Sequence, residues 1–164
     1  MFGSTEKTGL YMSSQLEYKV FKKDIQERQV AIMSTTPAAI RKAVMSLTQG
    51  FYFEAAHTLE RAVDADASRR IHGHTYDAEV TVRGVPDGKS GMVVDLAVLR
   101  LAMESTRDKL DHRFLDEVQG LSVPTLEGLC AFIATDLYER FGDALVSVRV
   151  GRKASGDSCL LSLG

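Results

Sequence analysis

A strict two-residue alternation between His72 and Arg83 is the feature that most constrains the fold of this chain. One set of alternate positions is histidine, aromatic or aliphatic, and comprises His72, His74, Tyr76, Ala78, Val80 and Val82. The intervening set is mostly polar or charged and includes Thr75, Asp77, Glu79, Thr81 and Arg83. Because successive side chains of a β-strand point to opposite faces, the pattern predicts a half-buried antiparallel strand. The same period places both histidines on its apolar face.

A second segment, Phe51 to His57, ends in another histidine on the face shared by Phe53 and Ala55. A single histidine on an apolar face is more often a hydrogen-bonded core residue than a ligand. Three that converge favour a metal site, because each buried imidazole carries two nitrogens that need partners. Three imidazoles leave the fourth position of a tetrahedral zinc ion open, as in catalytic sites. His57, His72 and His74 are therefore the candidate ligands of Zn²⁺, and iron or another divalent ion suits the same set.

The remaining segments predict an α+β domain. Asp95 has the position of an N-cap before a stretch of helical periodicity, and Pro124-Thr125-Leu126-Glu127 begins a second one. Alternating valines over residues 146–150 and an apolar run over 159–163 predict the last two strands. The order strand, strand, helix, helix, strand, strand is typical of the α+β class.

The first part of the chain differs from the rest. We divide the sequence into an N-terminal extension of unknown role, residues 1–48, and a main domain, residues 49–164. Within the extension, Thr36 followed by Pro37 is a typical helix start and predicts a short amphipathic helix over residues 38–47.

Composition excludes several classes of protein. The chain has 164 residues, a net charge of −2 and 45% hydrophobic residues, which is ordinary for one globular domain. It has no basic field of the kind that nucleic-acid binding needs. No apolar stretch approaches membrane-spanning length, and the first residues do not resemble a signal peptide. Two cysteines, Cys130 and Cys159, make no disulfide framework, so we expect a soluble cytoplasmic protein.

The fourth histidine of the sequence follows an aspartate, in Leu110-Asp111-His112. The carboxylate of Asp111 could orient the His112 imidazole for proton transfer, since histidine titrates closest to neutrality. A loop pair in which the aspartate caps a helix or forms a salt bridge is an equally good interpretation of these two residues alone.

Several motifs occur in an order that resembles the family of 6-pyruvoyl- and 6-carboxy-tetrahydropterin synthases. They are Phe53-Glu54-Ala55-Ala56-His57, Ile71-His72-Gly73-His74-Thr75-Tyr76, Gly91-Met92-Val93-Val94-Asp95, Leu110-Asp111-His112-Arg113-Phe114-Leu115 and Pro124-Thr125-Leu126-Glu127. The resemblance runs from about Phe51 to the C-terminus. It implies a tunnelling fold, in which a four-stranded antiparallel sheet carries two helices on one face. Subunits of such proteins join into a homo-oligomeric barrel, commonly a hexamer made of two trimers.

The resemblance also implies a chemistry. It assigns His57, His72 and His74 as zinc ligands, and 7,8-dihydroneopterin triphosphate as substrate. Zinc polarises the side-chain hydroxyls, bases move protons between side chain and ring, and triphosphate is lost. The 6-carboxy branch, which feeds queuosine synthesis, also releases acetaldehyde. Asp111 and His112 match the family's proton-transfer pair. Glu127 matches an acidic residue near the family's pterin pocket, and Thr125 in the same motif is a second candidate for substrate binding.

Two positions depart from the family pattern. Ser68 stands where the family has a catalytic cysteine, four residues before His72, and a hydroxyl is a far weaker acid than a thiol. Asp64 or Asp66 in the same loop could supply a base instead.

The second departure is Arg152, which stands where the family anchors the pterin with a glutamate. A guanidinium has only donors, so it cannot accept the paired N–H groups of a pterin, and it suits a carboxylate or phosphate. Alternatively, Arg152 turns outward and Glu127 anchors the ring. Both departures keep open a second function, that of a paralogue that binds zinc and a different, anionic heterocycle without the family's reaction.

Overall fold

The computed structural model describes residues 6–63 and 65–164, which divide into two compact units between Ala43 and Val44. The first unit contains helix α1 (Glu6–Thr35) and the short helix α2 (Ala38–Arg41). Ion pairs with four-residue spacing, Lys23–Glu27 and Asp24–Arg28, support the exposed surface of α1. None of the described helices combines the length and the apolar character that crossing a bilayer requires.

The predicted helix over residues 38–47 is only partly correct. Helix α2 ends at Arg41, and Pro37 occupies the cap position rather than the first helical turn. From Met45 the chain continues as a strand, because Met45 and Leu47 pair with Gly84 and Val82 of a neighbouring strand. Tertiary pairing therefore overrides the local helical preference at this point.

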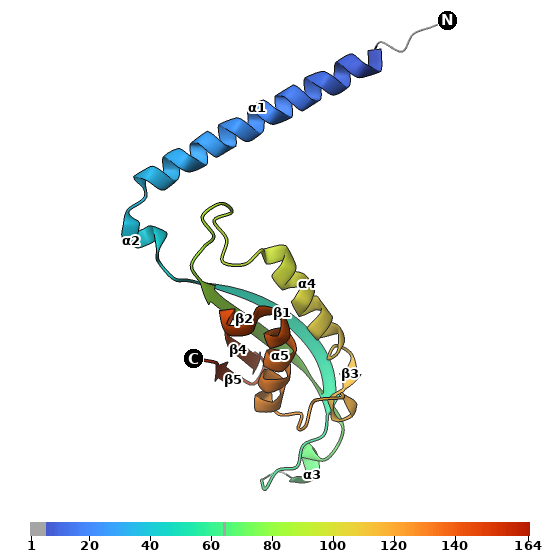
Figure 1. Cartoon of the computed structure of the whole chain (residues 1–164). Helices are drawn as coiled ribbons and strands as arrows, with labels where there is room; N and C mark the ends of the chain where they lie inside the picture. Colours follow the sequence, from blue (N-terminus) through green and yellow to red (C-terminus); the bar gives the residue numbers. More distant parts are fainter. Residues whose placement is uncertain (1–5, 64) are drawn as a thin grey trace, which may run out of the picture. The chain divides into compact units, whose positions relative to one another are not determined.

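The second unit is built on one sheet, with strand order β3-β1-β2-β4-β5 (Figure 1). Its strands are β1 (Met45–His57), β2 (His72–Gly84), β3 (Arg113–Phe114), β4 (Leu145–Arg152) and β5 (Asp157–Ser162). The expected four-stranded antiparallel sheet is wrong in one respect, because the sheet has five strands and is mixed. The difference is β3, which pairs in parallel with β1 through Ala55 and Arg113.

The second unit has two helices of several turns, α4 (Leu96–Asp108) and α5 (Leu126–Phe141). Both follow β2 and precede β4 in the chain. Asp95 caps α4 as predicted, since its side chain accepts a hydrogen bond from the Ala97 N–H at 2.8 Å. The Thr125 hydroxyl caps α5 by accepting from the Gly128 N–H. The short elements are α3 (Ala65–Ser68) and the 3-10 turns η1 (Leu115–Glu117) and η2 (Gly142–Ala144).

One hydrophobic core joins the helices to one face of the sheet. It contains the buried residues of α4 and α5 together with those that alternate along β1, β2 and β4, including Phe53, Tyr76, Val80, Leu99 and Ile133. Cys130 is buried in this core, and neither it nor Cys159 forms a disulfide. The other face of the sheet carries Tyr52, which is 64% exposed. His57, at the end of β1, closes the covered face and is itself buried.

Candidate metal centre and active site

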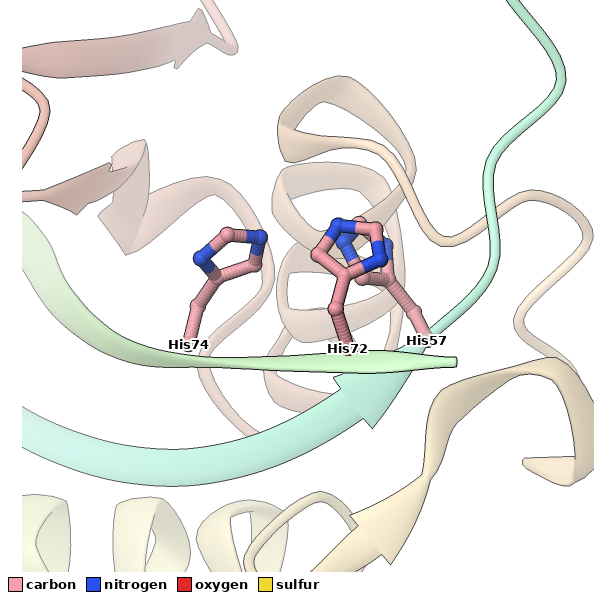
Figure 2. A group of neighbouring side chains, drawn as sticks. All are labelled: His57, His72 and His74. Atoms are coloured by element: carbon pink, nitrogen blue, oxygen red, sulfur yellow. The ribbon is translucent and has the colours of Figure 1, made fainter. Parts of the chain in front are cut away.

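The three histidines meet where β1 ends and β2 begins. The antiparallel register pairs His57 directly with His72 and places His74 opposite Ala55. All three side chains therefore project from the same face, and their rings rise together from the two strands (Figure 2). The ring centroids are 4.5 Å apart for His57 and His72, and 4.9 Å apart for His72 and His74.

The hydrogen bonds of these rings leave nitrogens available for a metal. Nδ1 of His57 lies 2.8 Å from the carbonyl oxygen of Pro124, and Nδ1 of His72 lies 2.8 Å from that of Arg70. A carbonyl can only accept, so each Nδ1 carries the proton and each Nε2 keeps its lone pair. The Nε2 atom of His57 is buried and has no partner among the described residues. One ligand atom from each ring lies within 4.8 Å of the others, so the residues fit a metal ion.

Two local structures hold His57 in place. The Pro124 carbonyl that orients its ring lies just before α5, where the chain passes so close to Gly128 that an added Cβ would lie 2.0 Å from the Val123 oxygen. The residue that follows β1, Thr58, donates hydrogen bonds to Asp116 from its N–H and its hydroxyl. Neither the Pro124 carbonyl nor Asp116 was predicted as part of the site, because backbone acceptors and loop carboxylates give no pattern in the sequence.

The electrostatic surroundings favour the neutral form of the His57 and His74 imidazoles. Burial lowers the pKa of His57, and the Pro124 carbonyl opposes this effect only in part. Burial and then the charge of Arg152 lower the pKa of His74 to about 4. Burial also raises the pKa of Tyr76, whose ring contacts those of His57 and His74, to about 12. His57 and His74 are therefore neutral at neutral pH, which is the form of imidazole that binds a metal ion.

Arg152 contacts the cluster directly instead of turning outward. Its side chain is only 14% exposed, and its Nη1 lies 3.1 Å from Nε2 of His74. Its Nη2 donates to Asp157 at 2.7 Å, and Asp157 is its cross-strand partner in the β4–β5 hairpin. Asp157 was not predicted, because its proximity to the histidines depends on the register of that hairpin.

A cavity of about 950 Å³ opens beside the histidines. His72, His74, Arg152 and Asp157 line it, and so does Ser68. Ser68 is buried at the end of α3, where its carbonyl accepts from the Leu59 N–H. The structure thus brings the residue in the cysteine position to the same hollow as two of the histidines. Of the two candidate replacement bases, Asp66 is exposed and pairs with Arg69, while Asp64 lies outside the described residues.

Asp111 and His112 form the predicted pair at a different place. The Nδ1 atom of His112 lies 3.0 Å from Asp111, whose carboxylate also accepts from the Glu54 N–H at 2.9 Å. This backbone bond holds the pKa of Asp111 below its usual value. His112 has a φ of 57°, a rare value for a residue with a side chain. Its ring is 76% exposed and lines a hollow of about 570 Å³ with Glu54, whereas His74 and Thr75 line both this hollow and the larger cavity.

The two remaining candidates lie at the start of α5. The Thr125 hydroxyl is engaged in capping the helix. Glu127 is exposed in the first turn and lies outside the lining of the cavity beside the histidines. Within one chain, therefore, the described residues divide into the histidine cluster with Ser68 and Arg152, the Asp111–His112 pair, and the α5 terminus.

Comparison with known proteins identifies the family. The chain matches the family described as 6-pyruvoyl tetrahydropterin synthase over residues 46–159, well over half of its length. The chain belongs to this family. The match includes all three histidines, the Asp111–His112 pair and Arg152.

Individual relatives carry the names of both branches. The chain is 35% identical over 105 residues to 6-carboxy-5,6,7,8-tetrahydropterin synthase of Synechocystis, covering 61% of this chain and 80% of that protein. It is 30% identical over 123 residues to 6-pyruvoyl tetrahydrobiopterin synthase of Dictyostelium discoideum, covering 72% and 90%. The structure of the Caenorhabditis elegans 6-pyruvoyl tetrahydropterin synthase superposes with a TM-score of 0.65 at 27% identity, covering 76% of this chain and 99% of that one.

Proposed function

We propose that this protein is a zinc-dependent lyase that acts on 7,8-dihydroneopterin triphosphate or a related pterin, in the manner of 6-carboxy-tetrahydropterin synthase. The observation that carries the proposal is the buried Nε2 of His57, which has no partner within the described fold and faces two further imidazoles. Leaving such an atom unpaired costs stability, so a ligand is the simplest reason for it. The names of the relatives supply the pterin.

The residues divide the work of such a reaction. His57, His72 and His74 would hold the ion, which when bound supplies Lewis-acid polarisation of the substrate's side-chain oxygens. His112 would carry protons between the side chain and the ring, and Asp111 would keep its imidazole oriented and stabilise it when charged. Ser68 lines the hollow next to the histidines and would bind a substrate hydroxyl, because an unassisted serine is a poor base.

We further propose that the complete site is made by more than one copy of the chain. His112 is exposed and lines a different hollow from Ser68 and Arg152. A homo-oligomer, such as a hexamer of two trimers, would bring the pair of one subunit to the histidines of another. Thr125 and Glu127 at the start of α5 would then contribute to the pterin pocket. A cytoplasmic location remains a prediction.

The test is direct. Zinc-loaded protein is incubated with 7,8-dihydroneopterin triphosphate, and the products are identified by mass spectrometry. Formation of a 6-carboxy or 6-pyruvoyl pterin, lost when the metal is removed and restored when it is returned, is the expected result. Intact substrate in the presence of one zinc per chain would contradict the proposal.

A second function, binding without this reaction, is favoured by Ser68 in the cysteine position and by Arg152 next to His74. In this alternative the protein is a catalytically altered paralogue that holds zinc and a different, anionic heterocycle. Ser68→Cys separates the two. A gain in turnover would indicate a weakened lyase, whereas zinc binding without turnover in either form would favour the paralogue.

A further inference from the structure

Arg152 and Asp157 form a donor–acceptor pair that faces the histidine cavity. They occupy directly opposed positions of the β4–β5 hairpin, so their side chains leave the same face of the sheet. Nη2 of Arg152 donates to Oδ2 of Asp157 at 2.7 Å, and the Ser155 hydroxyl donates to the same oxygen at 2.8 Å. Both charged residues line the cavity that His72 and His74 enter.

This arrangement is costly as a purely structural feature. The Nε atom of Arg152 is buried and has no partner among the described residues. Its Nη1 contacts the neutral imidazole of His74. A guanidinium that serves stability alone is usually paired on a surface or fully hydrogen-bonded. The ion pair between Lys153 of the same hairpin and Asp77 of β2 shows the ordinary case, since its lysine is 84% exposed. The unsatisfied, recessed guanidinium points to a ligand.

The pair also decides which kind of ligand fits. Asp157 already neutralises Arg152, so the guanidinium is a poor receptor for a second anion. In the described part of the chain both bonds to Asp157 go to Oδ2, which leaves Oδ1 free to accept. The Ser155 hydroxyl, followed by the Arg152 charge, keeps the pKa of Asp157 below its usual value, so this acceptor is ionised at neutral pH. The site thus offers a charged acceptor beside N–H donors.

We propose that Arg152 and Asp157 together bind the neutral edge of a 2-amino-4-oxo-pyrimidine ring. Asp157 accepts the hydrogen bonds of the ring N–H and the amino group, and Arg152 donates to the ring oxygen. The carboxylate absent at position 152 is therefore supplied from across the hairpin. This inference deepens the proposed function by assigning the residues that select the ring, and it opposes the interpretation of Arg152 as the receptor of an anionic heterocycle.

Binding rather than turnover tests the inference. The full-length zinc-loaded protein is titrated calorimetrically with three probes: neopterin, lumazine, in which a carbonyl replaces the amino group, and inorganic triphosphate. Asp157→Ala should weaken neopterin binding by about tenfold to a hundredfold, the range expected for loss of a charge-assisted hydrogen bond. Asp157→Asn, which keeps the shape and adds an amide donor, should reduce the preference for neopterin over lumazine.

The Arg149–Glu79 ion pair supplies a matched control, because it also crosses between strands of this sheet but lines neither the cavity beside the histidines nor the hollow next to His112. Glu79→Ala should leave neopterin affinity unchanged. Unaltered neopterin binding in Asp157→Ala would overturn the inference. The inference would also be overturned if the wild-type protein bound neither neopterin nor lumazine but bound triphosphate through Arg152. Protein that binds neopterin through Asp157 yet releases no product from the triphosphate substrate would refute the lyase and leave the inference standing.

Discussion

His57 and His112 both form a hydrogen bond through Nδ1, yet their surroundings differ, and so do the roles proposed for them. His57 is buried and donates to a neutral carbonyl, which leaves Nε2 as an uncharged lone pair. His112 is exposed and pairs with a carboxylate, the partner that favours an imidazole when it takes up a proton. One residue type thus suits cation binding at one place and proton transfer at another. The partner of Nδ1, a carbonyl for His57 and a carboxylate for His112, makes the difference.

The largest effect should come from truncating one member of the cluster. His72→Ala removes one of three ligands, and we expect metal affinity to fall by well over a hundredfold, since even outer partners of metal ligands contribute about tenfold to a hundredfold. Activity should vanish with the metal. Metal content measured by mass spectrometry after dialysis checks this. His112→Ala is the matched control and should retain one metal per chain. Equal loss of metal from both variants would contradict the distinction between the metal-binding His72 and the exposed His112.

Activity should respond to His112 without any change in metal content. His112→Ala removes the proposed proton carrier, and the rate should fall by about 10² to 10⁴, the usual contribution of general acid–base catalysis. Steady-state turnover of the metal-loaded variant is the measurement. Since the ring is exposed, the unfolding temperature should hardly change. A variant with full turnover would leave His112 with no role in the reaction.

The contact between His57 and the Pro124 carbonyl before α5 can be disturbed without substituting a histidine. Gly128→Ala forces a Cβ against the Val123 carbonyl, next to the Pro124 carbonyl that orients the ring. We expect the free energy of unfolding to fall by roughly 3 kcal/mol, as for other severe steric changes, and metal affinity to fall with it. Denaturant titration and metal titration report the two effects. Gly50→Ala in β1 is a useful comparison, because an added Cβ there makes only ordinary contacts, 3.4 Å from the Ala78 oxygen at the closest.

The smallest effect should come from Asp111→Asn, which tests the partner of His112. Loss of a charged acceptor for the Glu54 N–H should cost about 1 kcal/mol at neutral pH. The pKa of Asp111 is lowered in the folded chain, so its carboxylate stabilises the fold above pH 4 or so, and this contribution disappears as the pH falls through the folded-state pKa. Urea unfolding should therefore separate the two proteins more at pH 7 than at pH 3.

Local periodicity was sufficient to predict the part of the site that lies on regular strands. Alternation along β2 placed His72 and His74 on the apolar face, and the confirmed cap at Asp95 follows from side-chain chemistry within one turn. The Asp111–His112 contact was also accessible, because the two residues are adjacent. These features depend on interactions between residues close in sequence.

Features that depend on long-range pairing were missed or misjudged. A two-residue strand such as Arg113–Phe114 leaves no periodic pattern, so the mixed character of the sheet could not be read from the sequence. Met45 and Leu47 were assigned to a helix because their strand partners lie almost forty positions away. Asp157 joins the site only through its register with Arg152, and register is a property of the folded hairpin.

The segment 58–71 enters the sheet at His57 and leaves it at His72, so an ion bound between these two residues would fasten both ends of the intervening loop. Binding of such an ion would offset part of the entropic cost of closing the loop. That cost rises only slowly with loop length. Evolution can therefore lengthen, shorten or rewrite this loop while the ligands stay in register. Because the loop contributes Arg61 and Ser68 to the cavity, the fold permits the lining of the cavity to change while the three histidines stay in place on β1 and β2.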